Sequence, residues 1–448
     1  MQEKPRLEPV SQPATHYEAA RLALSHWRKR TVALLWIVYA GFYLCRVNLP
    51  AAQKDLAQAE GFSKRQLGLL LSALKLCYAV GQALNGVLAD RLGPRLILVI
   101  GLTGSAGLNL AFSHAANLRT MALIWAANGY FQACGWTPVV RVIANWFPAG
   151  RRDAASGAIG TSYILGSGLS WLLAGHLAER YGWRYAFWVP AWICLAIAVL
   201  VRVALREKPA DVQLDNDVEA SSNGAVAEEN PVCAATHVHT WGLWLVAFAM
   251  FLFNFGYHGV LDWTPHYLAE ARQLGAGAAA SQAFLMPLGG ALGCTVLTVL
   301  TRGRRVQMPA GAVALMLVAL AVLVYSFPAL AGQGMAVVTV ALALLGALSS
   351  VPGSMLACSM ATNVVPHDSA ATAAGIVDAL GYGGSALSGW GSGRIMDAVS
   401  AKRGATAAWR AVWHVWPLGI LGAAVLVAAL GRRERRNDAP RSNGRPAR

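Results

Sequence analysis

The sequence predicts an all-α membrane protein with twelve transmembrane helices. Of its 448 residues, 56% are hydrophobic and only 13% are charged, whereas soluble proteins contain roughly 45–50% apolar and about 25% charged residues. So few charged residues are not enough to cover the surface of a globular protein of this size. Most of the chain is therefore expected to face lipid. The apolar residues occur in runs of about 20, the length of a helix that crosses a bilayer, and no alternation of period two is sustained.

Twelve such runs follow one another along the chain. In order they span 32–54, 67–89, 95–113, 119–142, 154–176, 185–203, 241–264, 280–301, 307–327, 334–358, 370–394 and 409–430. Segment 204–240 separates the sixth run from the seventh and is rich in acidic residues, which predicts a hydrated, poorly ordered linker. We therefore expect a six-helix bundle over 32–203, a second bundle over 241–430, and polar tails at 1–31 and 431–448.

The distribution of basic residues predicts the orientation of the chain. The net charge is +15, which also suits a nucleic-acid binder, but the basic residues lie in the tails and in short gaps between apolar runs. With both termini inside, the cytoplasmic segments hold 23 Lys and Arg and the outside loops hold 11. This bias follows the positive-inside rule. It predicts cytoplasmic termini and explains the charge without nucleic acid.

The two halves contain one short pattern at equivalent places. Gly175 and Glu179 are separated by three residues near the end of the fifth run, and Gly393 and Asp397 repeat this spacing in the eleventh. The same order at matching positions indicates an internal duplication. Two six-helix repeats are typical of transporters, whose binding site lies between the repeats.

A charged pattern occupies the short loop between the second and third runs. Residues 86–95 read G-x3-D-R-x-G-x-R and include Asp90, Arg91 and Arg95. Carboxylates and guanidinium groups form charge-assisted bonds to neighbouring helix ends, which a conformational change makes and breaks. The pattern resembles the signature of the major facilitator superfamily. That resemblance implies the twelve-helix major facilitator fold and a gating role for these three residues.

Four further stretches resemble a narrower group, the organophosphate:phosphate antiporter family, which includes glycerol-3-phosphate and hexose-phosphate carriers. They are 43–48 (YLCRVN), 131–138 (FQACGWTP), 259–265 (GVLDWTP) and 374–383, which contains Ala-Gly and then Gly-Tyr-Gly. The family binds phosphate between an arginine of the first helix and its counterpart in the seventh. Arg46 matches the first of these residues.

The chain departs from the family at three positions. Tyr257 occupies the place of the second arginine, Tyr163 that of a histidine in the fifth helix, and Gln82 that of a lysine in the second helix. The usual clamp for a dianion is therefore incomplete. A carboxylate or phosphonate remains as open as a phosphate ester.

Arg46 is the main candidate for binding an anion, because a charge in mid-membrane is costly and an arginine fork grips an oxyanion in two places. Lys75 lies on one helix face with Tyr78 and Gln82. Its side chain either faces the cavity or extends toward the outer interface. Trp136, Tyr163, Tyr257 and Tyr382 complete the expected lining of the cavity.

A second set of residues is assigned to gating or coupling. His258 and Asp262 share one face of the seventh run and either relay protons or, in the case of Asp262, organise the outer helix end. Asp378 is a candidate partner of Arg46 or Lys75, or else a solvated residue. His258 is also counted with the substrate-binding residues. Arg141, after the 131–138 stretch, is assigned to the same gating set.

These features predict a secondary transporter of the inner (plasma) membrane that carries a small organic anion by alternating access, in exchange for inorganic phosphate. One alternative is a membrane sensor of a phosphorylated metabolite that signals to a histidine kinase. Another is a proton-coupled symporter of sugar acids or other carboxylates. The sequence contains no nucleotide-binding G-x4-G-K-[ST] pattern and no catalytic or metal-binding constellation. We expect a monomer without enzymatic activity or cofactor, and the lipid bilayer and the anion as its partners.

Overall fold

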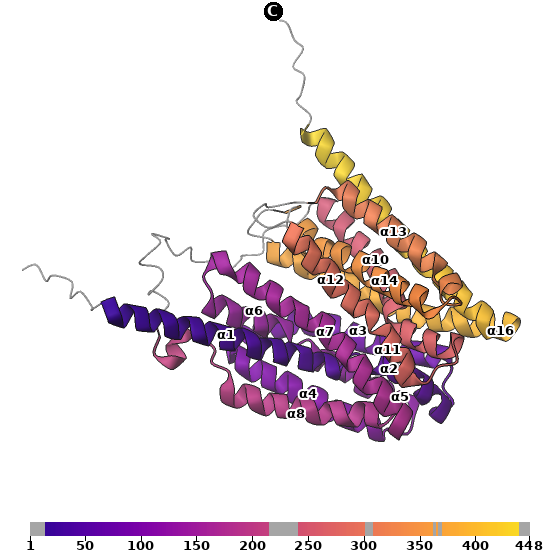
Figure 1. Cartoon of the computed structure of the whole chain (residues 1–448), viewed down its shortest axis with the longest axis horizontal. Helices are drawn as coiled ribbons and strands as arrows, with labels where there is room; N and C mark the ends of the chain where they lie inside the picture. The colour runs from indigo at the N-terminus through magenta and orange to yellow at the C-terminus, as the bar shows by residue number, and fades with distance from the viewer. Residues whose placement is uncertain (1–13, 215–240, 301–307, 362–363, 366–369, 439–448) are drawn as a thin grey trace, which may run out of the picture.

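The computed structural model describes residues 14–214, 241–300, 308–361, 364–365 and 370–438, and these residues form helices and short connections without strands. Two groups of helices lie side by side, one coloured indigo to magenta and the other orange to yellow (Figure 1). Within the described residues, eight stretches are long and apolar enough to cross a membrane. The predicted all-helical membrane fold is confirmed.

The N-terminal bundle contains the helices that precede the linker. They are α1 (Ala14–Leu44), α2 (Asn48–Glu60), α3 (Lys64–Leu92), α4 (Pro94–His114), α5 (Leu118–Gln132), α6 (Trp136–Trp146), α7 (Ala149–Tyr181) and α8 (Tyr185–Ala204). The linker then begins with a short 3-10 helix, η1 (Pro209–Val212). The described part of the linker ends at Leu214, and the remainder of the predicted linker lies outside the described residues.

The C-terminal bundle contains the helices that follow the linker. They are α10 (Trp241–Ala271), α11 (Ala276–Ala283), α12 (Leu285–Leu300), α13 (Ala310–Leu330), α14 (Met335–Ser354), a π-helical turn (Met355–Met360) and α16 (Ala370–Asp438). Helix α16 is sharply bent at Gly404, whose φ is +81°. The bend separates the two runs that the sequence predicts as its last transmembrane helices, and Figure 1 shows the resulting turn in the chain.

Three of the predicted helices are interrupted in the structure. The run 32–54 is divided between α1 and α2, the run 119–142 between α5 and α6, and the run 280–301 between α11 and α12. In each case a proline (Pro50, Pro138 or Pro287) lies in the first turn of the second helix. Proline has no amide hydrogen to donate to the preceding turn, so it begins a helix more readily than it continues one.

The two bundles meet along a small number of helices. Helix α3 packs along α16, α7 packs against α11 and α12, and α2 packs against α10 and α11. We call the end of the molecule that carries α2, the beginning of α3 and the end of α10 the outer end, because the Lys/Arg bias predicts that it faces outward. The opposite end is called the inner end.

Candidate functional site

A break in the first long helix places Arg46 between the two bundles. The three residues between α1 and α2 leave backbone groups without helical partners. The carbonyl oxygen of Cys45 accepts hydrogen bonds from Asn109 Nδ2 at 3.1 Å and from Asn128 Nδ2 at 2.8 Å. Both amides are buried. They stabilise the break and fix the backbone from which the Arg46 side chain extends.

The Arg46 guanidinium group contacts neutral partners from both bundles. Its Nη2 donates a hydrogen bond of 2.7 Å to Tyr382 Oη on α16. Its Cζ lies 4.1 Å from the ring centre of Tyr78 and 5.1 Å from that of Tyr43, within the range of cation–π attraction. Among the described residues, no carboxylate lies within ion-pair distance of Arg46. Its charge is therefore not cancelled by an ion pair within the described part of the chain.

Residues of α3 and α16 form the wall around this arginine. The rings of Tyr78 and Tyr382 are 4.4 Å apart, and Gln82 Nε2 donates a 3.0 Å hydrogen bond to Tyr78 Oη. Asp378, one turn before Tyr382, interacts with the Gln82 side chain and acts on Arg46 through its charge. The structure thus brings these residues of α3 and α16 close to Arg46.

Two tyrosines of α1 belong to the same site but were not among the predicted lining residues. The Tyr43 ring lies 6.1 Å from that of Tyr163 on α7, and the Tyr39 ring lies 5.1 Å from that of Trp136 on α6. Tyr39 and Tyr43 precede Arg46 by seven and three residues, a spacing that places residues on one helix face. That spacing was the signal by which the sequence could have revealed them.

Lys75 forms an ion pair with Asp262 on the opposite bundle. Both residues are buried, with 6% and 5% of their surface exposed, and Lys75 Nζ also lies 3.5 Å from Ser385 O. The expectation that Asp378 is the partner of Lys75 is therefore wrong, because Lys75 is paired with Asp262 of α10. Lys75 faces the other bundle and does not extend toward the outer interface.

Tyr257 gives the second half of the site an aromatic surface. Its ring stacks on Phe253, with centroids 5.4 Å apart and planes inclined by 8°, and its centroid lies 5.3 Å from that of His258. The buried Nδ1 of His258 has no hydrogen-bond partner in the described part of the chain. The predicted proton relay from His258 to Asp262 would involve an aspartate that already forms an ion pair with Lys75.

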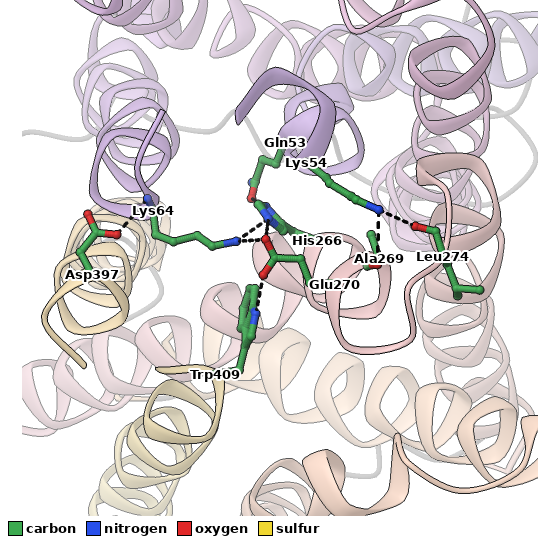
Figure 2. Close-up of polar contacts among 9 residues, drawn as sticks. All are labelled: Gln53, Lys54, Lys64, His266, Ala269, Glu270, Leu274, Asp397 and Trp409. Carbon is green, nitrogen blue, oxygen red and sulfur yellow. Dashed lines mark hydrogen bonds and ion pairs between the residues drawn. The ribbon is translucent and has the colours of Figure 1, made fainter. Parts of the chain in front are cut away.

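A group of polar side chains joins the bundles at the outer end, and we call it the outer network: Gln53, Lys64, His266, Glu270 and Trp409 (Figure 2). Lys64 Nζ lies 2.5 Å from both Glu270 Oε1 and His266 Nε2. Trp409 Nε1 donates to Glu270 Oε2 at 2.8 Å, and His266 Nδ1 lies 3.2 Å from Gln53 Oε1. The network connects α2 and α3 of one bundle with α10 and α16 of the other.

Charged side chains of each bundle also cap helix ends of the other. Asp397 accepts hydrogen bonds of 3.1 Å from the backbone amides of Lys64 and Arg65 at the beginning of α3, as Figure 2 shows for Lys64. Glu179 accepts one of 2.6 Å from the amide of Gly277 at the beginning of α11. Acidic groups are favoured at the positive N-terminal ends of helices. These caps are therefore formed only when the outer ends of the bundles meet.

The repeated glycine of the duplicated pattern makes these caps possible. A Cβ atom at Gly393 would overlap the carbonyl oxygen of Lys64, and one at Gly175 would overlap Ala276 and Ala280 of α11. Each glycine thus lets two helices of different bundles cross closely, and the acidic residue four positions later reaches the helix end. The two halves use the pattern in the same way.

The charged loop between α3 and α4 contributes differently. The Asp90 side chain lies outside the described residues, and Arg91 and Arg141 are exposed. The backbone amide of Arg95 donates to Glu207 Oε1 at 3.1 Å, and its Nη1 lies 3.5 Å from Leu205 O. Arg95 therefore contacts the beginning of the linker within its own bundle, and the gating role of this loop stays a prediction.

Comparison with known proteins agrees with this architecture. Residues 34–389 match the Major Facilitator Superfamily. The glycerol-3-phosphate transporter of Bacillus subtilis is 30% identical over 87% of this chain and 91% of its own length. A membrane sensor protein, UhpC of Escherichia coli, is 23% identical over 83% of this chain and 87% of its own length.

Solved structures show the same fold. A bacterial homologue of the human lysosomal transporter Spinster, in an inward-facing and unoccupied conformation, superposes with a TM-score of 0.72. The match covers 92% of this chain and 98% of that one, at 17% identity. The resemblance to organophosphate:phosphate antiporters is borne out by the relatives named glycerol-3-phosphate and hexose phosphate transporters. This multi-pass membrane protein belongs to the Major Facilitator Superfamily.

Proposed function

We propose that this protein is a secondary transporter that carries a small organic anion across the inner membrane by alternating access, with Arg46 as the anchor of the anion. The observation that carries the proposal is the position of Arg46. It extends from a helix break between the two bundles and reaches the opposite bundle through Tyr382. Transporters of this architecture bind substrate at that interface, where discontinuous helices supply the binding groups.

The charges around Arg46 favour a small anionic head group. Lys75 is neutralised by Asp262, and Tyr257 supplies an uncharged ring where antiporters of this family have a second arginine. Arg46 is thus the cation that a substrate can reach directly. Because relatives are named for glycerol-3-phosphate and hexose phosphate, we take a phosphate ester as the first candidate, ahead of a phosphonate or carboxylate. Exchange for inorganic phosphate is the proposed coupling.

The contacts between the bundles support an inward-open state. The outer network and the two helix caps close the outer end. Transport then requires a second state in which these contacts separate and the inner ends of the bundles approach each other. An anion that binds Arg46 neutralises its charge and makes closure around the site less costly.

The proposal is tested with purified protein in liposomes loaded with inorganic phosphate. We expect uptake of external glycerol 3-phosphate, another phosphate ester or a carboxylate, and an accompanying efflux of phosphate. Arg46→Lys should reduce uptake by about 10- to 100-fold, because lysine keeps the charge but lacks the planar fork. Arg394→Lys is the matched control, since Arg394 is exposed and stacks on Trp390 away from the site. Uptake by Arg46→Lys at the wild-type rate contradicts the assignment.

The same preparation distinguishes the sensor alternative, which is favoured by the similarity to a membrane sensor protein. If the protein is a sensor, the purified protein binds a phosphorylated metabolite, but liposomes that contain the protein show no uptake. It also distinguishes proton-coupled symport. In that case uptake follows an imposed pH gradient in liposomes without internal phosphate, whereas exchange requires internal phosphate and ignores the gradient.

A further inference from the structure

We propose a second anion subsite at the inner end of the N-terminal bundle, where a cavity of about 570 Å³ lies between α1 and α7. The proposal rests on the transport function and orientation proposed above. The cavity is lined by Arg21, Ser25, Arg28, Lys29, Val32, Ala33, Trp36, Phe147 and Arg151. Its size falls within the range of small-molecule sites, about 300–1,000 Å³.

The charge of the cavity indicates the class of ligand. Four of its nine lining residues are basic (Arg21, Arg28, Lys29 and Arg151), and none of the nine is acidic. They come from two helices, α1 and α7, and therefore converge on one space. Guanidinium and ammonium groups in this arrangement recognise oxyanions, and arginine in particular suits the planar, two-pronged recognition of phosphate or carboxylate.

One of these arginines is held in place by the fold. Arg28 is 7% exposed, its Nε donates a 2.8 Å hydrogen bond to Trp146 O, and its Cζ lies 5.6 Å from the ring centre of Phe147. A side chain fixed in this way loses little freedom when a ligand binds. The cavity is thus partly preorganised, unlike a cluster of solvated lysines and arginines on a membrane protein surface.

The position of the cavity connects it to the central site. Lys29, Val32, Trp36, Tyr39 and Tyr43 follow one another along α1 at intervals of three and four residues, the spacing that keeps side chains on one helix face.

Helix α1 ends at Leu44, 15 residues beyond Lys29, which corresponds to about 22 Å at 1.5 Å per residue, and Arg46 follows in the break. The indole of Trp36 is fixed by a 3.0 Å hydrogen bond from its Nε1 to Thr161 Oγ1 on α7. The subsite therefore lies at the inner end of the helix face that leads to Arg46.

This arrangement assigns the subsite a role on one side of the membrane only. It captures an oxyanion, phosphate above all, from the inner side and raises its concentration at the mouth of the site. Charged clefts increase the rate at which opposite charges associate by about 10- to 1,000-fold at low salt. The phosphate is either free in solution or part of a lipid head group, since basic pockets between helices at this depth also bind lipid phosphates.

The test is the double variant Arg21→Gln/Lys29→Gln, measured by transport in liposomes whose protein orientation is known. We expect the KM for inorganic phosphate on the inner face to rise about tenfold at low salt, because steering is lost. The KM on the outer face and the maximal rate should stay unchanged. The control is Arg30→Gln, which removes one charge from the same helix at a residue stacked on Trp27, away from the cavity.

Two outcomes overturn the subsite: an equal rise of KM on both faces, or an equal effect of Arg30→Gln. The lipid source is separated by repeating the measurement in pure phosphatidylcholine and in phosphatidylcholine with phosphatidylglycerol. A difference between wild type and variant that persists in phosphatidylcholine identifies free phosphate as the ligand. One that requires phosphatidylglycerol identifies the lipid phosphate.

Binding of phosphate in detergent keeps this inference separate from the proposed function. The wild type should bind two phosphates per chain, the double variant one, and Arg46→Lys one, so that the two sites are lost independently. If the wild type does not transport but still loses one phosphate in the double variant, the transport function fails and the subsite stands. A single site in the wild type, retained by the double variant, contradicts a subsite for free phosphate.

Discussion

The outer end and the central site join the same two bundles by different kinds of contact. At the outer end, side chains of one bundle bind helix ends and side chains of the other, as Asp397 does with the beginning of α3. In the centre, the contacts between the bundles are made by ionisable side chains: Arg46 binds Tyr382, and Lys75 binds Asp262. In the proposed function an anion competes for the central contacts, whereas the outer ones, among them the ion pair between Lys64 and Glu270, form when the helix ends approach each other. The proposed function thus assigns ligand recognition and closure to separate regions.

The largest effect is expected from breaking the central ion pair. Asp262→Asn leaves Lys75 buried without a counter-charge, and removing one partner of a buried pair costs about 3–5 kcal/mol. We expect a marked loss of thermal stability in detergent. The neutral double variant Lys75→Met/Asp262→Leu should recover most of it, because no buried charge remains.

A surface pair serves as the control for this prediction. Glu60→Gln breaks the ion pair between Glu60 and Arg184, which is 3.1 Å long and partly exposed, and such pairs contribute at most about 1 kcal/mol. If Asp262→Asn melts at the same temperature as Glu60→Gln, the central pair does not hold the bundles together.

An intermediate effect is expected from changing the charge of the central site. Tyr257→Arg adds a second guanidinium on the C-terminal bundle and should raise the affinity for dianionic phosphate esters by about tenfold relative to monoanions, the effect of roughly 1.4 kcal/mol. Tyr257→Phe keeps the ring and should leave this preference unchanged. Equilibrium binding in detergent measures both variants, and equal preferences in both would place the anion away from Tyr257.

The smallest effect is expected at the outer end. Asp397→Asn with Glu179→Gln keeps hydrogen-bond acceptors at both helix ends and removes only their charges, which costs about 1 kcal/mol in total. The population with an open outer end should then rise about fivefold. Spin labels at the exposed Gln58 and Lys402 report the separation of the bundles there.

The matched control for this pair is Asp211→Asn. Asp211 also accepts from a backbone amide, that of Glu207 at 2.9 Å, but both residues lie in the same segment. Its substitution should therefore leave the distance distribution unchanged. Identical distributions in the wild type and the Asp397/Glu179 variant would show that the charges of the caps do not bias the conformation.

Much of the fold could be predicted from the sequence, because lipid requires helices whose apolar runs are long and easily recognised. The interrupted helices were missed, although Pro50 and Pro138 marked where the second segments begin. Hydropathy measures the length of an apolar run and not the continuity of its hydrogen bonds, so a break within a run does not alter the signal.

The candidate site was predicted in part. Arg46 and its neighbours were found because a charge inside an apolar run is conspicuous and because the surrounding stretches resemble a known family. The partner of Lys75 was not found, because Asp262 is 187 residues away in the chain. Only the packing of α3 against α16, which itself packs against α10, brings it near. The outer network was not found either, because residues of these types are common next to loops.

In the transport proposed above, the hydrogen bond between Arg46 and Tyr382 has a consequence for the empty carrier. The tyrosine hydroxyl occupies a donor of the guanidinium group, so an arriving anion must displace an internal surrogate ligand. Its apparent affinity is lowered by the fraction of molecules in which that donor is taken. The same hydrogen bond also holds the two bundles of the unloaded protein together. In the proposed exchange, this contact slows reorientation without cargo and so protects one-for-one exchange against slippage.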